Sequence, residues 1–337
     1  MCMSNWRGKN GPLLIAEIGG NHEGDFDYAK RLTQLAIDAN VDYIKYQLYS
    51  GDSLVSEVEN PIRNKHFKKF ELSQEKYIEL AEMCRSNGVG FMASVWNVDY
   101  FDWIDKYMDI YKIGSGDMTA FPVLKATANL KKPIILSTGL SNMVEVKQAV
   151  DYIQSCDDLY KNEEYLSILQ CTAMYPIPLS DANLAVMESY SKEFGLPVGY
   201  SDHTEGSYAL EIAVAKGAQI LEFHFTDTRE GKEFRDHKVS LTKDEVLSLI
   251  ERIKKINQLT GNSEKRVLEI EGEHPTTFRR AVYPSKDLKA GIIITRDDLV
   301  VLRPNHGIDA RKLDQLIGKK LLTNIKRHSA LNWSNFK

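Results

Sequence analysis

Short apolar runs alternate with longer amphipathic stretches along the first three quarters of the chain. The runs, rich in β-branched residues, span 12–18, 41–47, 89–94, 110–113, 133–137, 166–170, 197–200 and 219–223. Between them, apolar residues recur every three or four positions, as in Phe26, Ala29 and Leu32 after a capping Asp25, which is typical of amphipathic helices. This alternation predicts the α/β class and a parallel (β/α)8 TIM barrel, completed by a helix over 243–259.

The pattern changes after the last predicted helix. Residues 263–277 are polar and charged, and they predict a linker between a barrel domain, 1–262, and a small domain, 278–337. Short apolar runs separated by turns predict strands in the small domain. So short a segment cannot bury a large core, and we expect it to pack on a barrel or on a second subunit.

Polar residues gather where the predicted strands end. In chain order they are Glu17, Lys45, Gln47, Ser94, Lys112, Ser115, Ser137, Gln170, Ser201, His203, Glu222 and His224. The carboxyl ends of the strands form the catalytic face of a TIM barrel. The sequence therefore predicts one active site at this rim.

Two histidines in this set follow neighbouring strands, in the motifs SDHT (201–204) and LEFHFT (221–226). Two imidazole ligands with open positions fit Mn²⁺, Mg²⁺ or another divalent ion better than a closed structural zinc site. Glu222, Asp202 and Asp236 are further candidates to bind the metal or to orient its ligands. For His237, which lies in a polar segment, we expect a surface or sugar-contacting role.

Lys45 and Lys112 both leave apolar strands for the rim, and two ammonium groups in one pocket favour a phosphate or carboxylate ligand. The nearby GSGD (114–117) and STG (137–139) segments supply hydroxyls and backbone N–H groups of the kind that cradle phosphate oxygens. A lysine imine, as in barrel aldolases, is an alternative that the residues leave open. Glu17 is a candidate general base, or else a salt-bridge partner of Lys45.

Composition narrows the possible partners. The 337-residue chain is 43% hydrophobic, with a net charge of −4 and a pI near 6.1. These values give no reason to expect nucleic acid or an anionic membrane as partner. The N-terminus has no apolar signal core, so we expect a cytoplasmic protein. The four cysteines show no CxxC spacing, and only Cys171, at a strand end, stands near the predicted site.

Together these motifs resemble those of the sialic acid synthase family. The segments that carry the resemblance are LLIAEIGGNHEGD, DYIKYQ, YKIGSGD, PIILSTG, CTAMYPIP, GYSDHT and LEFHFT. The tail RRAVYPSKDLKAG with LRPNHGID resembles the antifreeze-like SAF domain, a β-clip fold, that those enzymes carry. The resemblance implies condensation of phosphoenolpyruvate with an N-acetylhexosamine aldehyde, such as N-acetylmannosamine, to give a nine-carbon 2-keto-3-deoxy acid and phosphate.

The resemblance also implies roles for individual residues. His203 and His224 would hold Mn²⁺ or Mg²⁺, and Glu17 would be the leading acid or base. Phosphoenolpyruvate would contact Lys45, Ser94, Lys112, Ser115, Ser137 and Ser201. The sugar would contact Glu17, Gln47, Asp117, Tyr175 and Asp236, and also Arg303 of the partner subunit in a domain-swapped homodimer.

Three positions depart from the family pattern. Ala173 stands where the N-acetylneuraminate enzymes have Asn or Ser, Asp117 replaces Glu, and SVW (94–96) replaces TPF. Because these changes alter mainly the sugar side, the sequence defines the reaction better than the acceptor. Two alternatives stay open. One is a synthase that uses a phosphorylated aldose, against which the tail and Arg303 argue; the other is a non-catalytic sugar-binding barrel, against which the histidines and lysines argue.

Overall fold

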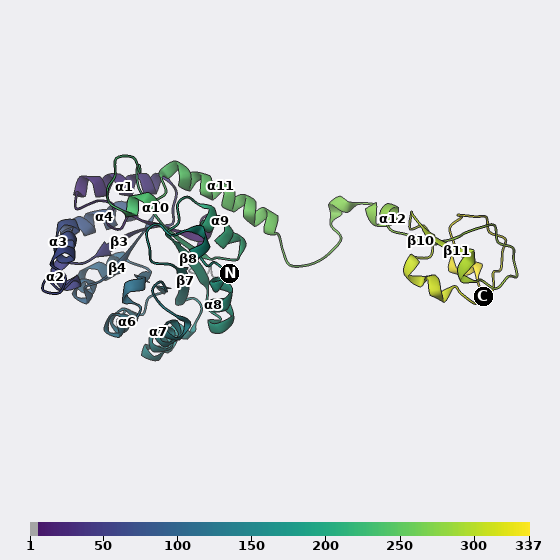
Figure 1. The fold of residues 1–337 in the computed structure, drawn as a ribbon, viewed down its shortest axis with the longest axis horizontal. Coiled ribbons are helices and arrows are strands. Elements are labelled where there is room, and N and C mark those ends of the chain that lie inside the picture. Colours follow the sequence, from purple (N-terminus) through teal and green to yellow (C-terminus); the bar gives the residue numbers. More distant parts are fainter. Residues whose placement is uncertain (1–5) are drawn as a thin grey trace. The chain divides into compact units, whose positions relative to one another are not determined.

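The structure, a computed structural model, describes residues 6–337 of the chain. The chain divides into a larger compact unit that ends at Gly261 and a smaller unit, Asn262–Lys337 (Figure 1). Cys2 lies outside the described residues, and Cys84, Cys156 and Cys171 carry free thiols. Among residues 6–337, no helix is both long and apolar enough to cross a membrane.

The larger unit is the predicted parallel barrel. Its strands are β2 (Gly11–Glu17), β3 (Tyr43–Leu48), β4 (Gly90–Val95), β5 (Tyr111–Ile113), β6 (Ile134–Ser137), β7 (Leu166–Cys171), β8 (Val198–Asp202) and β9 (Ile220–His224). They follow one another around the sheet in chain order, and β9 pairs with β2. A bridge between Phe91 and Met108 joins the β4 and β5 sides, so the barrel is nearly closed.

Helices surround the strands (Figure 1). They are α1 (Phe26–Asp38), α4 (Gln74–Ser86), α5 (Phe101–Ile104), α6 (Phe121–Ala128), α7 (Met143–Cys156), α8 (Val186–Phe194), α9 (Tyr208–Ala215) and α11 (Lys243–Thr260). The Asp25 carboxylate accepts a hydrogen bond from the Tyr28 amide, which confirms the predicted cap of α1. Apolar faces of these helices bury the outward side chains of the strands in one large core.

The barrel interior is built in layers, because alternate residues of a strand point to the same face. The lower layer is apolar and consists of Leu13, Ile15, Met92, Ile110, Ile135, Leu169 and Ile220, with Trp6 packed against it. Two residues further along the same strands come Glu17, Ser94, Lys112, Ser137, Cys171 and Glu222. The polar layer therefore lies directly on the packed apolar layer, which shields its charges from water on that side.

Three short helices lie in the connections that follow β3 and β9. They are α2 (Gly51–Leu54), α3 (Pro61–Phe70) and α10 (Asp236–Val239). The Asn64 amide donates to the carbonyls of Gly51 and Val55, and the Phe67 ring packs edge-on against Tyr49, 5.1 Å between centroids. These contacts fix α3 beside the carboxyl ends of the strands.

The smaller unit has its own core, although it is only 76 residues long. Its strands β10 (Ala281–Pro284) and β11 (Leu299–Leu302) pair in antiparallel fashion, and the short helix α12 (His274–Phe278) precedes them. Val282, Ile294 and Leu316 are at most 1% exposed at the centre of its apolar cluster. The unit accordingly contains strands, as its sequence predicted, and the structure shows that β10 and β11 pair in antiparallel fashion.

Candidate active site

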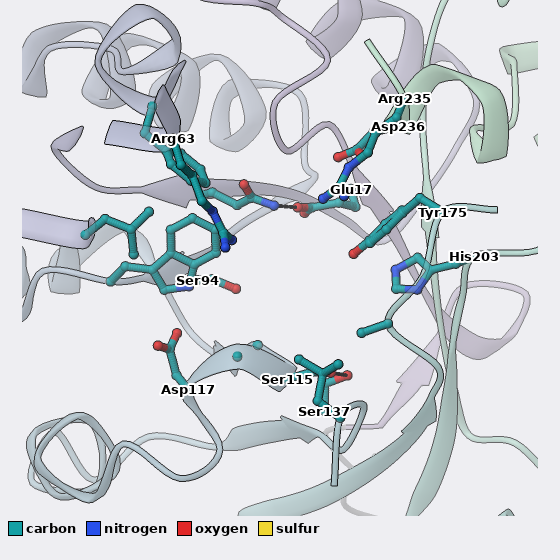
Figure 2. A pocket seen from close by; sticks show the side chains of 18 of the residues that line it. Glu17, Arg63, Ser94, Ser115, Asp117, Ser137, Tyr175, His203, Arg235 and Asp236 are labelled. Carbon is teal, nitrogen blue, oxygen red and sulfur yellow. Dashed lines mark hydrogen bonds and ion pairs between the residues drawn. The ribbon is translucent and has the colours of Figure 1, made fainter. Parts of the chain in front are cut away.

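A cavity of about 1210 Å³ lies at the carboxyl ends of the barrel strands. It is lined by all thirteen barrel residues to which the family resemblance assigns a contact: Glu17, Lys45, Gln47, Ser94, Lys112, Ser115, Asp117, Ser137, Tyr175, Ser201, His203, His224 and Asp236. Figure 2 labels several of them. Gln170, predicted at the same rim, does not line the cavity, because its amide donates to the Ala182 carbonyl at 3.1 Å. Arg303 belongs to the smaller unit, where it follows β11. The predicted convergence of strand ends is therefore real for the barrel residues.

Two lysines and two glutamates alternate on the cavity floor. The Lys45 ammonium lies 2.6 Å from the Glu17 carboxylate and 3.9 Å from Glu222, and the Lys112 ammonium lies 3.2 Å from Glu222. All four side chains are at most 8% exposed. Buried charges are tolerated only when they are paired in this way. The floor is neutral as a whole, and an anionic ligand would compete with the glutamates for the ammonium groups.

The two glutamates differ in their affinity for a proton. Burial raises the pKa of Glu17 against the lowering effect of Lys45, and the charge of Glu222 raises it further. Burial acts in the same sense on Glu222, but there the ammonium groups of Lys112 and Lys45 prevail and lower the pKa. Of two neighbouring carboxyl groups, the one with the raised pKa binds a proton more readily. Glu17 is therefore the better proton donor of the two.

The electrostatics of Lys45 argue against an imine mechanism. Burial by itself lowers the pKa of Lys45, but Glu17 and Glu222 outweigh burial and raise it. An imine-forming lysine must lose its proton to become a nucleophile. Lys45 instead stays a cation, suited to holding an anion.

His203 and His224 lie side by side at the ends of β8 and β9, as predicted, with ring centroids 5.3 Å apart. The Nδ1 atom of His203 lies 2.8 Å from the Thr172 carbonyl oxygen, so it carries the proton and its Nε2 lone pair is available. The Nδ1 atom of His224 is buried without a hydrogen-bond partner and lies 3.8 Å from the Asp236 carboxylate. Burial lowers the pKa of His224 well below its usual range, and the nearby cationic groups of Lys45 and Lys112 act in the same sense. His224 is thus neutral, the state in which imidazole binds a metal.

These side chains fit a divalent ion held by two histidines. Within residues 6–337, no group of three or more His, Cys, Asp or Glu side chains is arranged around a common metal position. The two imidazoles, with the orphaned Nδ1 of His224, would leave the remaining positions to water or substrate oxygens. The two-histidine centre stays a prediction, and these side chains are compatible with it.

Hydroxyl groups line the side of the cavity near β5 and β6. The Ser115 hydroxyl donates to the Ser137 hydroxyl at 3.1 Å and accepts from the Gly139 amide at 2.9 Å. A Cβ atom on Gly139 would lie 2.9 Å from the Ser115 hydroxyl and 3.1 Å from the Ala173 side chain. Only glycine leaves this group of donors in place, which explains the STG motif. The Ser201 hydroxyl donates to Glu222 at 3.1 Å.

Cys171 completes the inner wall, as its strand-end position suggested. Its thiol sulfur lies 3.8 Å from Nδ1 of His203. Burial by itself raises the pKa of this thiol, but His203, Lys112 and Ser115 lower it to about 7. The charge of this thiol therefore depends on His203 and Lys112.

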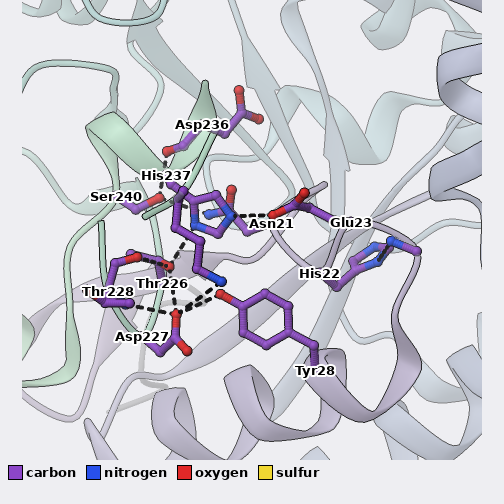
Figure 3. Close-up of polar contacts among 12 residues, drawn as sticks. Asn21, His22, Glu23, Tyr28, Thr226, Asp227, Thr228, Asp236, His237 and Ser240 are labelled. Atoms are coloured by element: carbon purple, nitrogen blue, oxygen red, sulfur yellow. Dashed lines mark hydrogen bonds and ion pairs between the residues drawn. The ribbon is translucent and has the colours of Figure 1, made fainter. Parts of the chain in front are cut away.

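The structure corrects two expectations about neighbouring residues. Asp202 does not line the cavity, because its carboxylate accepts hydrogen bonds from the Thr204 amide and the Tyr200 hydroxyl. His237 is neither at the surface nor in the cavity: it is 1% exposed and its ring nitrogens contact Glu23 and Thr226 (Figure 3). The expectation was wrong because the neighbouring residues in the sequence are polar, although the His237 ring itself is buried.

Sequence reasoning missed the cavity residues that come from the inserted segments. Arg63 and His66, on α3, line the mouth, and Arg63 points inward in Figure 2. Arg235, just before α10, lies over the Tyr175 ring, 4.6 Å from its centroid. A signal was present, since the connection between β3 and α4 is far longer than most strand-to-helix loops and such loops often carry function.

Comparisons with known proteins place these features in context. The NeuB family matches residues 32–265, and the SAF domain matches residues 279–337. The chain is 33% identical to the N,N'-diacetyllegionaminic acid synthase of Legionella pneumophila, over 96% of this chain and 94% of that protein. It is 30% identical to the human (Homo sapiens) N-acetylneuraminate-9-phosphate synthase, over 98% and 94%.

A solved structure is similar as well. The N-acetylneuraminic acid (sialic acid) synthetase from Leptospira borgpetersenii, in complex with citrate, is 28% identical with a TM-score of 0.72, over 79% of this chain and 90% of that chain.

Proposed function

Because the chain belongs to the NeuB family and ends in a SAF domain, we propose that it condenses phosphoenolpyruvate with an acetamido sugar aldehyde. The product would be a nine-carbon 2-keto-3-deoxy sugar acid, a sialic acid or an analogue, with release of phosphate. The observation that carries the proposal is the convergence of Lys45, Lys112, His203 and His224 in one cavity. The first pair suits an anion and the second a metal-bound carbonyl.

In this proposal phosphoenolpyruvate lies on the cavity floor. Lys45 and Lys112 bind its phosphate and carboxylate, and the hydroxyls of Ser94, Ser115, Ser137 and Ser201 complete the anion site. Binding would draw Lys112 toward the ligand and away from Glu222, 3.2 Å from it in the free protein. The same contacts orient carbon 3 of the enol toward the aldehyde carbon. Binding has then already fixed the translational and rotational freedom that the reaction would otherwise have to remove.

The sugar aldehyde lies above this floor, near Glu17, Gln47, Asp117, Tyr175 and Asp236. A divalent Mn²⁺ or Mg²⁺ held by His203 and His224 would polarise the aldehyde carbonyl. Carbon 3 of phosphoenolpyruvate forms the new bond to the aldehyde carbon, whose oxygen becomes a hydroxyl by gaining a proton. Water adds at carbon 2 and gives up one proton. The bond from carbon 2 to the phosphate oxygen then breaks: phosphate leaves with the electron pair, and the carbon 2 hydroxyl loses its proton to become the keto group.

Glu17 is the best-placed proton donor of the chain in this scheme. Burial raises its pKa, and the Gln47 amide donates to its Oε1 atom at 2.8 Å and fixes the carboxyl group. Proton transfer from a positioned acid of this kind accelerates such steps by about 10²–10⁴-fold. In this proposal the protein is a transferase that forms a carbon–carbon bond.

A domain-swapped homodimer, acting in the cytoplasm, belongs to the same proposal. Ile62 and Leu140, both lining the cavity mouth, are 85% and 75% exposed, which favours cover by another surface. In the smaller unit, Arg303 is exposed and its turn is anchored by the Tyr283 hydroxyl, which donates to the Pro304 carbonyl at 2.6 Å. An exposed arginine on an anchored turn suits a role in another subunit's site, where it would hold the acetamido group.

A phosphate-release assay tests the reaction directly. The purified chain would be incubated with phosphoenolpyruvate and, in turn, N-acetylmannosamine, its 6-phosphate or a 2,4-diacetamido-trideoxyhexose, with Mn²⁺, Mg²⁺ or a chelator. We expect phosphate release that requires phosphoenolpyruvate, an acetamido sugar and a divalent ion together. Turnover only with arabinose 5-phosphate or erythrose 4-phosphate would favour the other synthase class, and sugar binding without phosphate release would favour a non-catalytic barrel.

The same assay can decide whether the acceptor is phosphorylated. The Arg63 guanidinium lies over the Phe67 ring, 5.6 Å from its centroid, and points into the cavity mouth (Figure 2). If it meets an acceptor phosphate, Arg63→Ala should raise the KM of the 6-phosphate by about tenfold or more, since a charge-assisted contact contributes roughly 1.5–3 kcal/mol. The KM of the unphosphorylated sugar would then be unchanged.

A further inference from the structure

A buried polar network lies beside the cavity, between the turn after β2, the end of β9 and helix α10 (Figure 3). His237, on α10, is at its centre. Nδ1 of His237 lies 2.7 Å from the Thr226 hydroxyl, and Nε2 lies 3.3 Å from the Glu23 carboxylate. A carboxylate only accepts, so Nε2 donates its proton to Glu23 and Nδ1 of the neutral ring accepts from Thr226. One imidazole thus ties α10 to two separate strand ends.

Asn21 supplies a second connection. Its amide donates to the Phe225 carbonyl and to the Ser240 hydroxyl, both at 2.9 Å. The Ser240 hydroxyl in turn donates to the backbone carbonyl of Asp236 at 2.7 Å. Asn21, Thr226, His237 and Ser240 are all at most 1% exposed, so the bonds among these four residues are shielded from water.

The network ends at residues of the proposed site. The Phe225 amide donates to the Glu17 carbonyl, and the Leu241 amide donates to the His224 carbonyl, both at 2.8 Å. The Asp236 carboxylate lies 3.8 Å from the unpartnered Nδ1 of His224. Helix α10 has only four residues, and so short a helix has little stability of its own. Its place beside His224 must therefore come from contacts outside it.

We propose that His237 is a positioning residue: by bridging Glu23 and Thr226, it holds α10 so that Asp236 faces His224 at the acceptor side of the cavity. This inference rests on the proposed function for its consequence, which is correct placement of the acetamido sugar. The groups proposed for phosphoenolpyruvate lie on the barrel strands β3 to β8 or directly after them, and this network does not hold them. Loosening the network should therefore weaken binding of the acetamido sugar and leave binding of phosphoenolpyruvate unchanged.

Thr226→Val is the first test, because it removes the hydroxyl that Nδ1 of His237 contacts and keeps the side chain's shape. We expect the KM for the acetamido sugar to rise at least tenfold, while the KM for phosphoenolpyruvate changes less than twofold. Thr226→Ser, which restores the hydroxyl, should restore the sugar KM. Thr127→Val is the matched control, since Thr127 is also buried and its hydroxyl bonds only within α6, to the Val123 carbonyl.

Hydrogen exchange provides a readout that needs no substrate. In Thr226→Val and in His237→Phe, the amides of residues 233–240 should exchange at least tenfold faster, while those of α7 are unchanged. Unaltered exchange in this segment, or an equal rise in both KM values, would overturn the proposal. So would a lower melting temperature with both KM values intact. A wild type that releases no phosphate with any acetamido sugar would overturn the proposed function. The exchange of the two variants would still show whether His237 holds α10, because that measurement needs no substrate.

Discussion

Glu222→Gln tests whether the buried charges of the cavity floor depend on one another. The Glu222 carboxylate lies between Lys112, at 3.2 Å, and Lys45, at 3.9 Å. Glutamine keeps the shape of the side chain and removes its charge, so Lys112 loses the carboxylate that balances it. The Lys112 ammonium is buried, and it would then face the cavity uncompensated.

The size of the effect follows from the geometry. Two unit charges 3.2 Å apart attract by roughly 5 kcal/mol at an effective dielectric constant of about 20. Removing one partner of a buried pair costs about 3–5 kcal/mol of stability. At about 2 °C per kcal/mol for a unit of this size, the melting temperature of the barrel should fall by roughly 6–10 °C at pH 7.

The pH dependence has a definite sign. The pKa of Glu222 is lowered from its ordinary value of 4.5, so its stabilising effect is complete above that value and is lost as the pH falls through the lower folded value. The difference between wild type and variant should therefore shrink below pH 4.5. Phosphoenolpyruvate should raise the melting temperature of the variant more than that of wild type, because the anion supplies the missing negative charge.

Thermal melts by circular dichroism at pH 7 and pH 4, with and without phosphoenolpyruvate, would measure these differences. Glu251→Gln is the control, since Glu251 forms an exposed pair with Lys254 at 2.7 Å and should change nothing measurable. Equal melting temperatures for Glu222→Gln and this control would refute the coupling of the floor charges. An equal response of variant and wild type to phosphoenolpyruvate would refute the role of Lys112 in binding it.

Three further predictions concern the metal, the smaller unit and a buried acid. His203→Ala or His224→Ala should weaken Mn²⁺ binding at least tenfold in an electron paramagnetic resonance titration with the fold intact, and unchanged affinity in either would contradict the ligand assignment. Arg303→Ala should raise the KM for the sugar far more than that for phosphoenolpyruvate, and mixing it with His224→Ala chains should restore some activity; no recovery would count against a domain swap. Burial raises the pKa of Asp117 to about 6 despite Lys112, so stability is lost as the pH rises through 6. Asp117→Asn should therefore melt higher than wild type at pH 7.5 but not at pH 3.5, and equal melting at both would contradict this.

The fold and much of the candidate site could be predicted because both follow from local patterns. Period-two alternation makes Ile15 and Glu17 share a face, as it does Ile220 and Glu222, so a strand that buries the first residue carries the second to the rim. Once the strands are parallel, every such rim residue meets the others at one end of the barrel. The histidine pair followed in the same way from two neighbouring strands.

The inserted segments could not be predicted in this way. The α3 segment brings Arg63 to the mouth of the cavity, and contacts of Asn64 and of the Phe67 ring hold it there. Hydrophobic periodicity does not predict such contacts. His237 shows the same limit, because its polar neighbours suggested a surface position, whereas Glu23, 214 positions away, keeps it buried. Such contacts depend on the packing of a particular loop.

By itself, then, the sequence determined the barrel, the ring of polar strand ends and the family. The tertiary structure decided how those polar groups pair: Glu222 lies between two lysines, and Glu17 against one of them. It also decided which irregular segments reach the cavity, and it turned His237 inward to bridge two strand ends. The physical reason is that strand periodicity is a local property, whereas pairing, burial and the resulting pKa values depend on distances across the barrel, which exist only once it has closed.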